Sequence, residues 1–125
     1  MFSSLIYVAL GGAAGATLRY LTGLWVLRLV GPGFPMGIIT VNIVGSFLMG
    51  LCATVASQRG FAPLSPLVMT GFLGGFTTFS AFSLEAVTLF ERGEIGAAAA
   101  YVAISVIGSL AALMLGLWVM RGVLA

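Results

Sequence analysis

The chain has 125 residues, of which 61% are hydrophobic and 6% are charged, and its mean hydropathy is +1.21. Soluble globular domains carry about 25% charged residues, so this composition excludes an ordinary soluble domain and indicates an integral membrane protein. Five arginines and three glutamates give a net charge of +2. They form no basic cluster, so nucleic acid is not expected as a partner.

The residues that most often carry chemistry are scarce. Histidine is absent and Cys52 is the single cysteine, which excludes an intrachain disulfide and His/Cys metal sites. Glu85, Glu91 and Glu94 are too few and too close in sequence to form a convincing acid–base pair. An enzyme is therefore not expected.

Four apolar segments predict four membrane-spanning helices over residues 4–30, 36–56, 67–90 and 95–120. Each reaches the roughly 20 residues that cross a bilayer, and the short connections contain turn-forming residues. The first segment lacks a charged leader and a cleavage site, so we expect it to be retained. The prediction is an all-α, multi-pass membrane protein in contact with lipid, with residues 1–125 forming one domain.

Arg19 lies well inside the first segment. A guanidinium at the centre of a membrane helix costs about 2.5–3.5 kcal/mol on insertion scales. One interpretation is an arginine that extends to a lipid phosphate near the helix end. The other is a cation that attracts anions into a water-filled vestibule.

Asn42 occupies the middle of the second segment, where an amide without hydrogen-bond partners would be costly. Two interpretations remain open at this point. Asn42 either holds neighbouring helices together or lines a pore as a hydrogen-bond donor.

The third segment contains the most informative stretch, residues 71–85, where glycines, hydroxyls, two phenylalanines and a carboxylate interrupt an apolar run. Glycines followed by Thr77 and Thr78 favour local unwinding. Irregular backbone at membrane depth is tolerated only where it is buried in protein or lines a cavity. We therefore expect a broken third helix and a candidate site at the break.

Phe79, Phe82 and Glu85 follow the break at a spacing of three, which predicts a shared helix face with Ser83 beside it. Such a face usually serves packing. Phenyl rings nevertheless have electropositive edges, so two converging edges can contact an anion without trapping it.

Tyr101, Ser105 and Ser109 recur every four residues in the fourth segment and therefore form a hydroxyl stripe on one helix face. Together with Asn42 and the ring edges, this stripe makes an inventory of donors rather than acceptors. Such groups suit a small, hard anion.

The arginines do not specify an orientation in the membrane. With four spans, Arg59 and Arg121 lie on the side of the termini, and Arg28 and Arg92 lie on the other. The positive-inside rule depends on a bias between the two sides, so this tie predicts dual topology and an antiparallel homodimer. A single topology set by the amino terminus or Arg19 is the alternative.

Three motifs carry a resemblance to a known family. They are Gly11-Gly-x-x-Gly-Ala-x-x-Arg19-Tyr20, Val41-Asn42-x-x-Gly45-Ser46-Phe47 and Gly71-Phe-x-Gly-Gly-Phe-Thr-Thr-Phe-Ser-x-Phe82-Ser-x-Glu85. The chain resembles the Fluc (CrcB-type) fluoride channels over all four spans.

This resemblance implies an antiparallel dual-topology homodimer in a bacterial inner membrane, with two pores that passively export cytoplasmic fluoride. It implies that Arg19 lies in a vestibule and that Thr78 and Glu85 belong to a polar or proton-linked path. The implied fluoride-pore residues are Asn42, Phe79, Ser80, Phe82, Ser83, Tyr101, Ser105 and Ser109.

The resemblance also implies a structural sodium ion at the dimer interface. Its ligands would be the backbone carbonyls of Gly74 and Thr77 from both subunits. Hard oxygen ligands suit an alkali cation.

Two positions depart from the family pattern. Ile38 stands where threonine is common, four residues before Asn42, and Ala81 stands where threonine is common between Ser80 and Phe82. We expect a thinner or slower polar path, without loss of function.

Three functions other than a channel make different demands on the sequence. A small four-helix multidrug exporter would need a carboxylate in the first span, which has none. A proton-coupled fluoride exporter that uses Glu85 is harder to exclude. A non-transporting assembly subunit would explain the small-residue spacing, but not Asn42 and Arg19 together with the predicted break.

Overall fold

The computed structural model describes residues 1–60 and 63–125, and within them every regular element is a helix. This confirms the all-α prediction. In chain order the elements are α1 (Phe2–Val30), α2 (Met36–Gln58), the π-helix η1 (Pro66–Leu73), α3 (Gly74–Phe76), α4 (Ser80–Glu91) and α5 (Ile95–Leu124).

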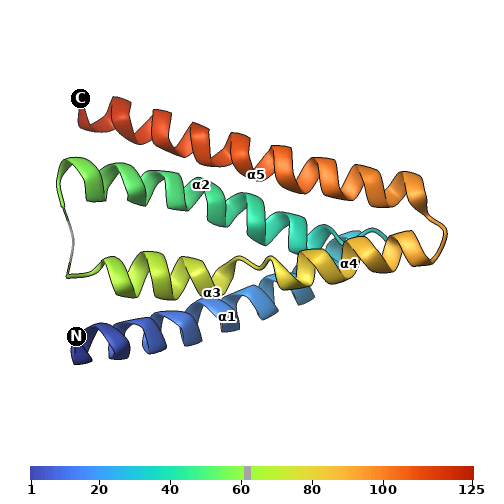
Figure 1. The fold of residues 1–125 in the computed structure, drawn as a ribbon, viewed down its shortest axis with the longest axis horizontal. Helices are drawn as coiled ribbons and strands as arrows, with labels where there is room; N and C mark the ends of the chain where they lie inside the picture. Colours follow the sequence, from blue (N-terminus) through green and yellow to red (C-terminus); the bar gives the residue numbers. More distant parts are fainter. Residues whose placement is uncertain (61–62) are drawn as a thin grey trace.

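The helices form an antiparallel bundle in which η1, α3 and α4 follow one another along a single path (Figure 1). Both termini lie at the same end of this bundle. The Nη2 group of Arg59, just after α2, donates a hydrogen bond to the carbonyl of Leu124 at 3.3 Å, which places the end of α2 beside the end of α5.

Turn residues set the helix ends. Gly31 and Gly33 follow α1 with φ angles of 86° and 123°, and Gly93 follows α4 with a φ of 83°. Glycine populates this left-handed region without the steric cost of a Cβ atom. The connections can therefore be as short as the antiparallel bundle requires.

Three segments of the described chain are long and apolar enough to cross a membrane: Met36–Gln58, Pro66–Glu91 and Ile95–Leu124. They match the predicted second, third and fourth spans to within a few residues. The helix α1 is not among them, because its glycines, hydroxyls and arginines dilute its apolar residues. Its membrane crossing stays a prediction.

The third segment departs from a continuous α-helix in two ways. Residues 66–73 form a π-helix, which the sequence did not predict, and residues 77–79 are not helical. At Thr77 the backbone is extended, with φ −85° and ψ 160°. π-helical turns are rare and occur frequently at functional sites.

Glycines allow two close helix contacts. A Cβ atom at Gly15 of α1 would meet the carbonyl oxygen of Phe72 and, at 2.9 Å, the amide nitrogen of Phe76. A Cβ atom at Gly116 of α5 would meet the carbonyl of Phe47 and, at 3.2 Å, the Cα of Gly50 in α2. In lipid, helix association depends on such close packing. These glycines therefore allow α1 to pack closely against η1 and α3, and α5 to pack closely against α2.

We predict that Gly116→Ala destabilises the bundle. Its new methyl group would meet backbone atoms of α2, which can yield only if the helices separate, and overpacking of this kind costs about 1–3 kcal/mol. A thermal melt of the purified protein in detergent measures the effect.

Gly96→Ala is the matched control, because it lies on the same helix and a Cβ atom there has no neighbour within 4 Å. It should leave the melting temperature unchanged or raise it slightly. Equal melting temperatures for the two variants would contradict the close contact of α2 and α5.

Candidate functional site

Two cavities flank the non-helical residues 77–79. The first, called here the arginine cavity, has a volume of about 490 Å³ and is lined by residues that include Arg19, Ile38, Thr78 and Glu85. The second, called the phenylalanine cavity, has a volume of about 330 Å³. Thr78 lines both, so it stands between them.

The phenylalanine cavity gathers most of the polar residues that the sequence singled out. Helices α2 and α5 contribute to it, together with the non-helical stretch and the start of α4. Its lining includes Asn42, Ser46, Thr77, Thr78, Phe79, Phe82, Ser105 and Ser109.

Asn42 is bound on both sides to the backbone of Thr78. Its Nδ2 donates to the Thr78 carbonyl at 2.9 Å, and its Oδ1 accepts the Thr78 N–H at 2.7 Å. An asparagine amide has two N–H donors, so one N–H remains for a ligand. The helix-linking and cavity-lining interpretations of Asn42 are therefore compatible.

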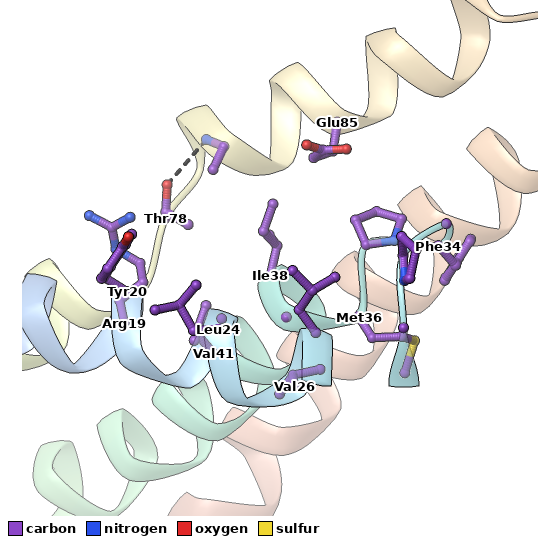
Figure 2. A pocket seen from close by; sticks show the side chains of 18 residues that line it. Arg19, Tyr20, Leu24, Val26, Phe34, Met36, Ile38, Val41, Thr78 and Glu85 are labelled. Atoms are coloured by element: carbon purple, nitrogen blue, oxygen red, sulfur yellow. Dashed lines mark hydrogen bonds between the residues drawn. The ribbon is translucent and has the colours of Figure 1, made fainter. Parts of the chain in front are cut away.

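The hydroxyl of Thr78 organises the start of α4. Its Oγ1 accepts the N–H of Ala81 at 3.1 Å, which provides an acceptor for one of the N–H groups left free at the start of the helix. It also lies 3.4 Å from the hydroxyl oxygen of Ser80. In Figure 2 a dashed line marks the hydrogen bond that the Thr78 hydroxyl accepts at the arginine cavity.

Arg19 is tied to the third segment from α1. Its Nε donates to the carbonyl of Gly75 at 3.0 Å. Because α3 ends at Phe76, no backbone N–H of the described residues bonds to Gly75 from beyond that end, and the arginine supplies a donor instead. The terminal nitrogens of Arg19 remain available to the arginine cavity, which the residue lines.

The two phenylalanines of the third segment lie together. Their ring centroids are 5.5 Å apart, but Phe82 is 9% exposed whereas Phe79 is 77% exposed. Phe82 also stacks on Tyr101 of α5, with ring centroids 5.4 Å apart. One ring is thus anchored in the core and the other faces outward.

The hydroxyl stripe of α5 is only partly exposed to the phenylalanine cavity. Ser105 and Ser109 line it, while Tyr101 is fully buried behind Phe82. Within the described residues, the hydroxyls of Tyr101 and Ser105 are buried and have no hydrogen-bond partner. Most buried polar groups in proteins have a hydrogen-bond partner. These two hydroxyls have none in the described part of the chain, so each can still donate a hydrogen bond.

Glu85 differs from its predicted position. It lines the arginine cavity, whereas Phe79 and Phe82 line the other. Three residues advance an α-helix by about 300°, which leaves Glu85 about 60° around α4 from Phe82. That rotation is enough to place the carboxylate on the side of Arg19 and Ile38 (Figure 2).

Two predicted serines are not among the residues that line either cavity. Ser83 donates its hydroxyl to the carbonyl of Phe79, just before α4, at 2.9 Å, and Ser80 is exposed beside Thr78. Ser46, by contrast, lines the phenylalanine cavity although it was not among the predicted site residues. Its place four residues after Asn42, on the same face of α2, was the available signal.

A family model described as CrcB-like protein, Camphor Resistance (CrcB), matches residues 6–117. A protein of Ruegeria sp. (strain TM1040) is 60% identical over 125 residues and is covered, like this chain, over 99% of its length. One of Cereibacter sphaeroides (strain ATCC 17029 / ATH 2.4.9) is 59% identical over 100% of both chains.

A third relative, from Roseobacter denitrificans (strain ATCC 33942 / OCh 114), is 62% identical over 122 residues, which are 96% of this chain and 97% of the relative. All three relatives carry the name fluoride-specific ion channel FluC. These matches confirm the family that the three motifs indicated.

We predict that Ser105→Ala stabilises the protein. The substitution removes a buried hydroxyl without a partner, whose burial costs about 1–3 kcal/mol, so the melting temperature should rise by a few degrees. Ser109→Ala is the control, because Ser109 is half-buried and its loss should change little. A fall in the melting temperature of Ser105→Ala would mean that this hydroxyl has a structural partner.

Proposed function

The chain belongs to the CrcB-like family, and on that premise we propose that it is a fluoride-selective channel that passively exports fluoride from the cytoplasm. The relatives that match over nearly the full length are named as fluoride-specific channels, which supports fluoride as the transported ion. The observation that carries the mechanism is the phenylalanine cavity, whose lining includes no arginine, lysine or carboxylate.

The polar groups of that cavity can donate to an anion without holding it permanently. They are the second N–H of Asn42, the hydroxyls of Ser105 and Ser109, and the edges of the two phenyl rings. Conduction requires sites that replace hydration and yet release the ion. Neutral donors meet this requirement better than a buried guanidinium would.

We propose that Arg19 concentrates anions in the arginine cavity before they reach this site. A cationic group in a cavity with low-dielectric walls raises the local anion concentration. From there an ion passes Thr78, which lines both cavities. Its oxygen accepts the N–H of Ala81. When Ser80 is the donor in the contact between the two hydroxyls, the hydroxyl hydrogen of Thr78 is free to donate to the ion.

A second, antiparallel copy completes the proposed pore. Phe79 is 77% exposed beside the polar groups of the cavity, and a partner subunit that covers it would close the pore wall. The balanced arginines favour insertion in both orientations. In this proposal α1 also crosses the membrane, so that each subunit has four spans, and two-fold symmetry gives two pores in the bacterial inner membrane.

A structural sodium ion fits the carbonyls freed at the non-helical stretch. Within the described residues no hydrogen bond reaches the carbonyl of Gly74 or Thr77 from the residues that flank the interruption, and Gly74 is exposed. Two-fold symmetry would bring four such oxygens together, which suits a hard cation. The ion would serve the dimer interface rather than the fluoride path.

Proton-coupled fluoride export is the second candidate. Glu85 lines the arginine cavity, and within the described residues its carboxylate forms no ion pair. A carboxylate in that position is able to exchange protons with an aqueous cavity. The channel remains the better-supported function because the close relatives are named as channels.

We predict rapid fluoride efflux from potassium-loaded liposomes that contain the purified protein, once valinomycin sets the voltage. A fluoride electrode follows the efflux, and chloride efflux is the selectivity control. Because passive conduction needs no proton, efflux should proceed without a pH gradient and should persist in Glu85→Gln. Efflux that requires a pH gradient and disappears in Glu85→Gln would favour coupled export, and none from the unaltered protein would favour an assembly subunit.

We also predict that Ile38→Thr raises fluoride flux. Ile38 lies between Thr78 and Glu85 in the arginine cavity (Figure 2), where it presents an apolar side chain. A threonine hydroxyl there would offer one hydrogen bond to the ion, worth a gain of about 2- to 10-fold. Ile38→Val has the shape of threonine without the hydroxyl, and it should leave the flux unchanged. Equal fluxes in the two variants would refute the role of the missing hydroxyl.

A further inference from the structure

We propose that Asn42 and Thr78 are positioning residues for the cation site, because their side chains remove the two backbone N–H groups that would otherwise cover the carbonyls of Gly74 and Thr77. This inference rests on the sodium site of the proposed function. It assigns to two residues of the fluoride path a separate task in the assembly of the dimer.

The argument starts from the hydrogen-bond pattern of a continuous α-helix, where each carbonyl accepts the N–H four residues later. Gly74 would then accept from Thr78, and Thr77 would accept from Ala81. Both carbonyls would be occupied, and neither could bind an ion without breaking a hydrogen bond. A cation site at these positions therefore needs both donors to be diverted.

Both donors are diverted. The N–H of Thr78 bonds to Oδ1 of Asn42 at 2.7 Å, and the N–H of Ala81 bonds to Oγ1 of Thr78 at 3.1 Å. The same asparagine fixes the Thr78 carbonyl through its Nδ2 at 2.9 Å. Two side chains thus free the two carbonyls that the sodium proposal names.

The carbonyls of Leu73 and Gly75, on either side of Gly74, both accept hydrogen bonds. Leu73 accepts both the N–H and the hydroxyl of Thr77, each at 3.0 Å, and Gly75 accepts from Arg19 at 3.0 Å. Carbonyls on either side of Gly74 are therefore covered, while Gly74 itself is left open at the surface. An oxygen without a donor is costly in a membrane, and a cation shared with a second copy offsets that cost.

The test measures sodium-dependent stability rather than fluoride flux. The dimer is purified in N-methyl-D-glucamine chloride, and its melting temperature is followed as sodium chloride replaces that salt at constant ionic strength. An ion that binds only the folded dimer raises the melting temperature with its concentration. The variants are Thr78→Val and Asn42→Leu, which remove the hydrogen bonds with little change in side-chain volume.

We expect the unaltered protein to be stabilised by sodium, and each variant to need at least about tenfold more sodium for the same shift, since its ion must compete with a restored backbone hydrogen bond. Thr78→Ser keeps the hydroxyl and should retain the sodium response. Tyr101→Phe alters a buried hydroxyl on α5, away from the carbonyls, and should also retain it, whatever its effect on flux.

The outcomes separate this inference from the proposal on which it rests. If the unaltered protein gains no stability from sodium, the sodium site fails and the inference fails with it. If the unaltered protein responds and Thr78→Val and Asn42→Leu respond equally, the sodium site stands and the positioning role is refuted. A variant that does not form a dimer without sodium but forms one at high sodium supports the inference.

Discussion

The backbone amides and carbonyls that the third segment frees at residues 77–79 need polar partners, because hydrocarbon offers none. Three side chains meet most of this demand. Asn42 bonds both backbone groups of Thr78, the Thr78 hydroxyl accepts from Ala81, and Arg19 covers the carbonyl of Gly75. The interruption is therefore attached to α1 and α2, and the two cavities on either side of it depend on those attachments.

The attachment to α1 depends in turn on glycine. A Cβ atom at Gly75 would lie 2.8 Å from the carbonyl oxygen of Gly12 and 3.2 Å from the amide nitrogen of Ala16. Because Gly75 has no Cβ atom, α1 comes close enough for the Nε of Arg19 to reach the carbonyl of Gly75. Small residues in membrane helices permit such close approach, and here they also set the position of the one charge on α1 that lines the arginine cavity.

The sequence indicates the helices and the polar residues of the site, but it does not indicate which residues of different helices contact one another. Apolar length indicated the helices, and the polar residues within them indicated most of the two cavities, because such residues are rare in hydrocarbon. The bond between Asn42 and Thr78 joins residues 36 apart and depends on the rotation of two helices, which no periodicity specifies. Glu85 lies on the same helix as Phe82, and the offset of about 60° that a three-residue spacing gives was available from the sequence, but which cavity it faces was not. The π-helix at residues 66–73 has no distinctive sequence pattern, so an α-helix was the natural expectation.

In the proposed pore, the protein must leave some hydrogen-bonding groups free for the conducted ion, and the hydrogen bonds around Asn42 and Thr78 do so. Asn42 uses its oxygen and one N–H on Thr78 and keeps the other N–H. The Thr78 hydroxyl oxygen accepts the N–H of Ala81 and lies 3.4 Å from the hydroxyl oxygen of Ser80. Ser105 and Tyr101 have no partner among the described residues. In the proposed pore, the groups that hold the backbone in place would thus also retain a donor for the anion, and a fixed site would remain weak enough to release its ion.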